Sequence, residues 1–274
     1  MLCLGCSAPV PQASNHQVSS TDVATVTDVH FPSRNIGGLL WYRIIVPTVK
    51  NGERLPVLYL LHGANSNPAE IQQLSDVVNL AASSRLIVVM PQAETSYYTN
   101  ARYHLHARWE GAITEELPKN VEAGFPALTS RDHRGIAGIS MGGYGAVKLA
   151  LKHQELYSFA GTISGALDIT RRPTSIRRWA QTSRIWSIFG VRAGTRRGED
   201  VFALLDGAKD LRNITWFSSC GKADPLYPIN SYFIRRLRER GIPVNSISIP
   251  GGHDWQSWNT SLPSLFKVAA ERLR

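Results

Sequence analysis

A serine between two glycines at a fixed spacing is the feature of this chain with the clearest chemical meaning. Residues 138–142 read Gly-Ile-Ser-Met-Gly and match the Gly-x-Ser-x-Gly pattern of a reactive serine, here Ser140. An apolar run at 135–137 precedes the pattern, and a helix-like segment at 144–151 follows it. Because strand and helix approach closely at such a turn, a Cβ beside the serine would obstruct it. We expect Ser140 to lie exposed at the carboxyl end of a strand; the alternative is a small-residue turn without chemistry.

A serine hydroxyl reacts at neutral pH only when a base takes its proton and an acid orients that base. His253 is the candidate base, because it follows the last predicted strand and the only other histidine after Ser140 is His153, on the helix that leaves the turn. Asp224 is the candidate acid, since it directly follows a strand and precedes a proline. Asp254 adjoins His253, so it cannot orient that ring well and is interpreted as structural. Other aspartates between the serine and the histidine include Asp200, Asp206 and Asp210.

Acyl chemistry at a serine also needs two backbone N–H groups aimed at the oxygen that becomes negative, an oxyanion hole. Met141 is expected to supply one, because it follows Ser140 at a helix N-terminus, where free amides and the helix dipole favour an anion. Ala64, in the loop after the third predicted strand, is expected to supply the other, with Gly63 as the next choice. His62 is expected to hold this loop in place rather than take part in the chemistry.

The elements that must position these residues alternate between strand and helix, which indicates an α/β fold with a mostly parallel sheet and helices on both faces. Eight strands are expected, at 25–30, 39–46, 57–61, 86–90, 134–137, 159–164, 214–218 and 244–249. Helices are expected at 68–82, 113–121, 143–152, 229–240 and 262–273. The sequence thus predicts one α/β domain over residues 25–274, with a small insert before the seventh strand.

Composition limits the classes of partner. The chain has 274 residues, 43% of them hydrophobic and 19% charged, and a formal net charge of +9. More than half of that charge comes from residues 165–212, which hold ten basic and five acidic side chains. This insert either recognises a substrate carboxylate or phosphate or is a solvated surface. No nucleic-acid motif, metal-ligand cluster or dinucleotide fingerprint occurs, and no apolar run is long enough to span a membrane. We expect no nucleic-acid partner, no cofactor and no metal; the oligomeric state is not predicted.

The first residues resemble the end of a bacterial lipoprotein signal. Residues 2–7 read Leu-Cys-Leu-Gly-Cys-Ser, and residues 9–21 have the composition of a polar tether, so residues 1–24 are treated separately from the domain. Neither a charged nor an apolar signal region precedes them. Two interpretations stay open: a start further upstream, with a location in the cell envelope or outside the cell, or a chance likeness in a cytoplasmic protein. With three cysteines no disulfide framework is evident, and Cys220 is expected to be a buried free thiol.

Five segments between residues 57 and 258 resemble the α/β-hydrolase fold and, within it, the putative esterase family. That family includes esterase D, S-formylglutathione hydrolase, tributyrin esterases, feruloyl esterase modules and mycolyltransferases. The matching segments are 60–63, 139–146, 164–168, 221–224 and 252–255. The resemblance implies Ser140 as nucleophile, His253 as general base and acid, Asp224 as its orienting acid, and the amides of Ala64 and Met141 as the oxyanion hole.

The substrate is less constrained than the chemistry. Formylglutathione hydrolases usually carry His-Ser-Tyr at the catalytic histidine, whereas Asp254 and Trp255 follow here, which argues against that substrate. Loops 91–111 and 165–212 are expected to set substrate choice. Aromatic side chains that could form a wall for an acyl or aryl group are Tyr97, Tyr98, Trp109, Trp255 and Trp258, although ordinary packing explains each of them nearly as well.

The leading hypothesis is therefore a serine carboxylesterase that hydrolyses short-chain acyl esters, either small molecules or esters linked to a polysaccharide, through an acyl-enzyme. Two other enzymatic hypotheses share the chemistry: an acyltransferase to a sugar or lipid acceptor, and a carbohydrate esterase that removes acetyl or feruloyl groups. The non-enzymatic hypothesis is a hydrolase fold without activity that serves as a binding module.

Overall fold

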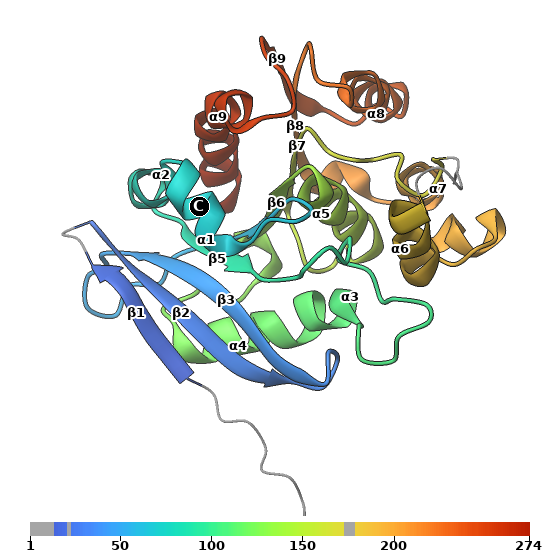
Figure 1. Ribbon diagram of the computed structural model, residues 1–274. Helices are drawn as coiled ribbons and strands as arrows, with labels where there is room; N and C mark the ends of the chain where they lie inside the picture. Colours follow the sequence, from blue (N-terminus) through green and yellow to red (C-terminus); the bar gives the residue numbers. More distant parts are fainter. Residues whose placement is uncertain (1–13, 21–22, 173–178) are drawn as a thin grey trace, which may run out of the picture.

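The computed structural model describes residues 14–20, 23–172 and 179–274 (Figure 1). The lipoprotein-like run at 2–7, and Arg177 and Arg178 of the basic insert, lie outside these residues.

A single mixed sheet organises the described part of the chain. Its nine strands lie in the order β1-β2-β3-β5-β4-β6-β7-β8-β9. The first three are antiparallel to their neighbours, and β4 to β9 run parallel. The strands are β1 (Ser14–Ser20), β2 (Ala24–Ser33), β3 (Gly38–Pro47), β4 (Val57–Leu61), β5 (Ile87–Pro91), β6 (Arg134–Ile139), β7 (Phe159–Ile163), β8 (Thr215–Gly221) and β9 (Val244–Ile249).

The observed sheet has one strand more than the eight predicted. Strands β2 to β9 correspond to the eight predicted ones, and the additional strand is β1, in the stretch interpreted as a polar tether. It pairs antiparallel with β2 at the edge of the sheet, with a register shift between Gln17 and Ser19. Its sequence, Ser-Asn-His-Gln-Val-Ser-Ser, has no apolar alternation. Backbone pairing with the neighbouring strand therefore forms β1 where the side chains give no strand signal.

Helices cover both faces of the sheet, as predicted. Helices α1, α2 and α9 pack on one face. Helices α3 to α8 pack on the other face, where their apolar side chains join the larger of the two apolar clusters. The helices are α1 (Pro68–Leu74), α2 (Val77–Ser84), α3 (Trp109–Gly111), α4 (Leu117–Gly124), α5 (Met141–Lys152), α6 (Trp179–Phe189), α7 (Val201–Gly207), α8 (Tyr227–Glu239) and α9 (Trp255–Leu273).

Helices α3, α6 and α7 were not predicted, and three of the predicted helices differ clearly from the observed ones. The helix predicted over 68–82 is two helices, because the chain is extended at Ser75, and α2 then begins at Val77. A π-helical turn over Ala112–Glu116 precedes α4. Helix α9 starts seven residues earlier than predicted, since the side chain of Asp254 caps it by accepting the N–H of Ser257 at 2.9 Å.

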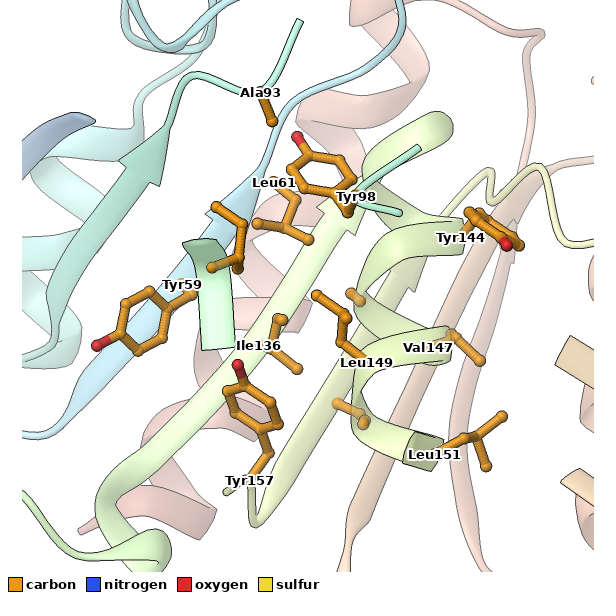
Figure 2. Close-up of a cluster of buried hydrophobic side chains, with 14 of the residues drawn as sticks. Tyr59, Leu61, Ala93, Tyr98, Ile136, Tyr144, Val147, Leu149, Leu151 and Tyr157 are labelled. Atoms are coloured by element: carbon orange, nitrogen blue, oxygen red, sulfur yellow. The ribbon is translucent and has the colours of Figure 1, made fainter. Parts of the chain in front are cut away.

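The central strands are buried on both faces, and successive side chains alternate between the two apolar clusters. In β6, Ile136 points into the cluster beneath α5, where it lies close to Leu149 (Figure 2). Its neighbour Ala137 belongs to the cluster beneath α9. Burying a side chain of the size of Ile136 stabilises the fold by about 1.5–3 kcal/mol. This packing on both faces fixes the ends of β4, β6, β8 and β9, from which the candidate site is built.

Candidate active site

The turn at Ser140 joins β6 to α5 with a strained backbone. Ser140 has φ 56° and ψ −111°, and its N–H donates to the carbonyl of Ile163 in the neighbouring strand at 2.9 Å. A Cβ on Gly138 would lie 2.3 Å from the carbonyl carbon of Gly142, and a Cβ on Gly142 would lie 2.1 Å from the carbonyl oxygen of Leu61. Both glycines are therefore sterically required, because the backbone of α5 lies directly against the ends of β6 and β4.

Three side chains from three different loops form a hydrogen-bonded chain at this edge. The Nε2 of His253 lies 2.9 Å from the Oγ of Ser140, and its Nδ1 lies 2.8 Å from the Oδ2 of Asp224. An ionised carboxylate only accepts, so Nδ1 carries the proton and Nε2 is left to accept the serine O–H. Asp224 is buried, and its other oxygen accepts the N–H of Leu226 at 2.7 Å. The structure thus brings together the three residues that the sequence singled out.

The loops that carry the acid and the histidine pack backbone against backbone. The N–H of Ala223 donates to the carbonyl of Gly251 at 3.0 Å, and a Cβ on Gly221 would lie 2.3 Å from that same carbonyl oxygen. The ring of His253 meets Trp258 edge to face, with centroids 5.1 Å apart. Asp254, interpreted from the sequence as structural, is the cap of α9. These contacts hold the imidazole ring, whose side chain is 32% exposed, in one orientation.

The loop after β4 is anchored by a buried histidine. The Nε2 of His62 accepts the N–H of Ala93 at 3.1 Å, so its Nδ1 donates to the carbonyl of Gly63 at 2.7 Å. Burial lowers the pKa of His62, which keeps the ring neutral as this hydrogen-bond pattern requires. The hydroxyl of Tyr98 donates to the carbonyl of His62 at 3.0 Å. His62 therefore holds the loop, as predicted.

Of the two residues predicted to form an oxyanion hole, one follows the serine in the chain and the other lies in a loop that packs beside it. Met141 is the first residue of α5, where backbone N–H groups have no acceptor within the helix. Ala64 follows Gly63, at which a Cβ would lie 3.6 Å from the Cβ of Ser140. The loop after β4 is thus within van der Waals range of the serine side chain.

A cleft of about 910 Å³ opens beside this loop. The segments that line it come from the β4–α1 loop, the stretch after β5, the loop before α3, and α6, so both loops expected to set substrate choice contribute. Its lining residues are Asn65, Ser66, Gln92, Glu94, Thr95, Ser96, Ala101, Tyr103, His104, Leu105, His106, Ala107, Trp109, Arg184 and Ile188. Sequence reasoning missed most of these residues, since they follow no motif and meet only in the folded chain.

Of the predicted aromatic wall, one residue lines this cleft: Trp109. The prediction that Tyr98 forms part of this wall is wrong, because its side chain is fully buried and supports the loop after β4. Tyr97 packs against the rings of Tyr144 and Phe189 in the core.

The two tryptophans that follow the candidate base lie on the α1 side of the site. The indole N–H of Trp255 donates to Glu70 of α1 at 3.1 Å, and its ring packs against Trp258. Neither tryptophan lines the 910 Å³ cleft.

Several arginines of the basic insert have structural partners. Arg171 pairs with both carboxylate oxygens of Asp200, and Arg172 pairs with Asp168. Arg196 is buried, and its Nε donates to the carbonyl of Gly190 at 2.9 Å. These three side chains hold the insert together, which favours the structural interpretation for this part of its charge.

A buried group of charges lies beneath the site on α5. The Nζ of Lys148, which is fully buried, lies 2.9 Å from Glu199, and Lys152 reaches Glu110 at 2.8 Å and Glu199 at 3.0 Å. Burial alone would raise the pKa of Glu110. The hydrogen bond from His153, the charge of Lys148 and the hydrogen bond from Lys152 outweigh burial and hold that pKa well below its usual value. The network ties α3 and the insert to the helix that follows Ser140.

Three further observations concern a cysteine near the site, metal ligands and membrane-spanning helices. Cys220, at the end of β8, is a buried free thiol as predicted, and burial raises its pKa to about 12. Within residues 14–20, 23–172 and 179–274, His, Cys, Asp and Glu side chains form no group of three that could hold a metal ion. None of the helices in these ranges combines the length and the apolar character needed to cross a bilayer.

Known proteins share this architecture. The model of the family described as Putative esterase matches residues 33–267. An esterase of Mycobacterium tuberculosis is 28% identical over 243 residues, 80% of this chain and 51% of that protein, so the chain spans about half its length. An acetyl esterase of Caldicellulosiruptor saccharolyticus is 28% identical over 226 residues, 79% of this chain and 84% of that protein.

Among solved structures, a fluorophosphonate-binding serine hydrolase of Staphylococcus aureus, FphF, is similar with a TM-score of 0.80. It is 26% identical, and the match covers 90% of this chain and 99% of that one. This likeness confirms the predicted α/β-hydrolase fold. Since the family model spans most of the sequence, the chain belongs to the putative esterase family.

Proposed function

We propose that this protein is a serine carboxylesterase that hydrolyses short-chain acyl esters through an acyl-enzyme. The observation that carries the proposal is the hydrogen-bonded chain from Ser140 through His253 to Asp224, at the strand edge where open α/β sheets place their sites. Membership of an esterase family supports the reaction class. The likeness to an acetyl esterase supports a short acyl group.

The reaction begins when the Oγ of Ser140 attacks the ester carbonyl carbon while the Nε2 of His253 takes the serine proton. The negative charge that develops on the carbonyl oxygen is bound by the amides of Met141 and Ala64. The tetrahedral intermediate then collapses, the bond to the alcohol breaks, and His253 returns its proton to the departing alkoxide. Asp224 keeps the proton on Nδ1 and stabilises the imidazolium that forms.

Water completes the cycle by the same steps. His253 takes a proton from the water as its oxygen attacks the acyl carbon, and the released proton returns to Ser140 when the acid leaves. A protonated His253 would have no lone pair on Nε2, so the mechanism requires the neutral form of the ring.

The test is hydrolysis of p-nitrophenyl acetate, butyrate and octanoate by the wild type and by Ser140→Ala. The variant should lose at least about a thousandfold in kcat, since the nucleophile is gone while the oxyanion hole remains. Ser83→Ala, at an exposed position on α2, is the matched control and should keep wild-type rates. Equal rates in wild type and Ser140→Ala would refute the proposal.

Two further measurements separate the alternatives. A fluorophosphonate probe that labels the wild type but not Ser140→Ala excludes a binding module without activity. Product analysis with a sugar or a lipid alcohol at high concentration detects acyl transfer, which would appear as an acylated acceptor in place of the free acid.

A further inference from the structure

We propose that the rim of the 910 Å³ cleft docks on an anionic lipid surface, so that the enzyme takes its ester from that surface. This inference rests on the proposed esterase function. The rim patch consists of three exposed apolar side chains, Tyr103, Leu105 and Val191, and four arginines around them, Arg102, Arg108, Arg184 and Arg192.

The apolar part of the rim patch is unusually open to solvent. Leu105 is 87% exposed, Tyr103 60% and Val191 54%, the highest values among the large hydrophobic residues described. Single exposed apolar residues are common on protein surfaces, but neighbouring ones indicate a binding surface.

Backbone hydrogen bonds place these residues together. The N–H of Arg102 donates to the carbonyl of Ile188 at 3.0 Å, and the N–H of Tyr103 donates to the carbonyl of Ser187 at 3.4 Å. These bonds join the loop before α3 to the end of α6, only a few residues before Val191. Figure 1 shows this loop projecting from the body of the protein beside α6. The exposed residues of the loop and of the segment after α6 therefore belong to one region of the surface.

The charged part of the rim patch is cationic. All four of its arginines are exposed, whereas Arg171 and Arg172 of the same insert pair with Asp200 and Asp168. None of the ion pairs in the part of the chain that the structure describes involves the four arginines of the rim patch. Arg184 makes one long contact, 3.4 Å from Nη1 to the Oδ1 of Asn65. A single carboxylate, that of Glu94, lies among the residues that line the cleft. The balance of charge thus favours an anionic surface.

Part of the rim patch lines the cleft. Tyr103, Leu105 and Arg184 belong both to the rim patch and to the cleft lining, and the lining also includes Asn65, which Arg184 contacts and which neighbours Ala64. An ester anchored in a lipid surface could thus enter the cleft while the rim stays in contact with that surface.

The chemistry of the rim patch favours lipid over polysaccharide. Aliphatic side chains such as Leu105 and Val191 insert among acyl chains, and arginines bind lipid phosphates through paired hydrogen bonds. Sugar recognition instead relies on flat aromatic faces with amide or carboxylate partners. In the rim patch Tyr103 has such a face, whereas Leu105 and Val191 have none and would contribute little to the binding of a sugar.

The experiment is cosedimentation of the wild-type protein with vesicles of phosphatidylcholine alone and of phosphatidylcholine with phosphatidylglycerol. Binding should be at least tenfold stronger to the anionic vesicles and should weaken with salt. Each arginine near an anionic surface strengthens binding about fivefold, so Arg102→Gln with Arg192→Gln should weaken it by about 25-fold. Arg235→Gln with Arg238→Gln, on α8, is the matched control and should bind as the wild type does.

The apolar contribution is tested by Leu105→Ser with Val191→Ser, which should weaken binding to anionic vesicles at least tenfold. Leu39→Ser with Leu74→Ser removes two exposed leucines elsewhere and should leave binding unchanged. Equal binding by the rim and control variants, or no binding to either vesicle, would overturn the proposal. Retention on insoluble polysaccharide without vesicle binding would also overturn it.

Two controls separate this proposal from the esterase function. Ser140→Ala should bind vesicles as the wild type does, because the serine is not part of the rim. Arg102 and Arg192 do not line the cleft, so their double variant should hydrolyse soluble p-nitrophenyl butyrate at the wild-type rate. Vesicle binding without any ester hydrolysis would refute the function and leave the docking surface standing.

Discussion

Gly142 and Leu61 lie so close that a Cβ on the glycine would stand 2.1 Å from the leucine carbonyl oxygen. One contact thus joins the helix that follows the proposed nucleophile, Ser140, to the strand that leads into the predicted oxyanion loop. The distance between the serine and that loop is therefore fixed by a contact between two backbones, with no side chain between them whose movement could change it.

Gly142→Ala should consequently lower both stability and activity. The added methyl must displace α5 or β4, and overpacking of this kind costs about 1–3 kcal/mol. The measurements are the free energy of unfolding in urea and kcat on p-nitrophenyl butyrate. Gly124→Ala, at the end of α4 with nothing within 4 Å of its Cβ position, is the control and should leave both values close to wild type or slightly raise stability. A Gly142→Ala protein with wild-type kcat would contradict the close contact.

Asp224→Asn should reduce kcat by about a thousandfold or more, because an amide at this position no longer fixes the proton on Nδ1 of His253. Binding of substrate should change much less, so KM is expected to stay within a few fold. The matched control is Asp254→Asn, since asparagine also caps a helix well and the side chain of Asp254 is engaged in capping α9. If both variants lose the same activity, Asp224 has no special role.

Trp258→Ala should lower kcat with little effect on KM, because the imidazole ring of His253 loses the aromatic face that it meets edge to face. A loss of about tenfold corresponds to an aromatic contact worth about 1.4 kcal/mol. Trp258→Phe keeps an aromatic ring and should recover most of the rate. A purely structural role would instead lower thermal stability equally in both variants and leave their kcat alike.

The buried network on α5 should make stability depend on pH through Glu110. Its pKa is held below the ordinary value in the folded protein, so its contribution is full above the unfolded pKa and disappears as the pH falls from there toward the folded value. Glu110→Gln should lose up to about 3–5 kcal/mol at pH 7, since the buried charge of Lys148 and the half-buried charge of Lys152 are left with Glu199 as their carboxylate partner.

The measurement is urea unfolding at a series of pH values from about 7 down to about 3, which spans the range in which an unfolded glutamate takes up its proton. The difference in stability between wild type and Glu110→Gln should shrink once the pH falls below the ordinary pKa of a glutamate side chain. Glu115→Gln, exposed on the preceding π-helical turn, is the control and should follow the wild-type curve. A difference that stays constant across this range would exclude Glu110 as the titrating group.

Sequence reasoning succeeded where a residue's role depends on its immediate neighbours. Ser140 lies between two sterically required glycines, and Asp224 and His253 follow directly on strands whose apolar runs can be recognised, so their meeting at one edge could be predicted. The parallel sheet and its helical layers follow from the same alternation of patterns.

Sequence reasoning failed where the environment of a residue depends on contacts with segments far away in the chain. Tyr98 looked like a wall of the site, but its burial depends on the loop after β4, which lies more than thirty residues away in the chain. The polar strand β1 exists only because β2 offers a free edge. Lys148 and its partners Glu110 and Glu199 come from three separate segments, and no local spacing in the sequence links them.

The ion pairs of Lys148 also bear on how substrate range can change. They fasten the bases of two cleft-lining segments, through Glu110 and Glu199, to the helix behind the proposed nucleophile. The tips of those segments are joined to each other by backbone hydrogen bonds from Arg102 and Tyr103 to α6. A loop taken from a relative should therefore fit when it supplies a carboxylate that can pair with Lys148, or when the loop it replaces does not include Glu110 or Glu199. The boundaries of a segment that can be exchanged are thus set by these buried charges rather than by the ends of helices and strands.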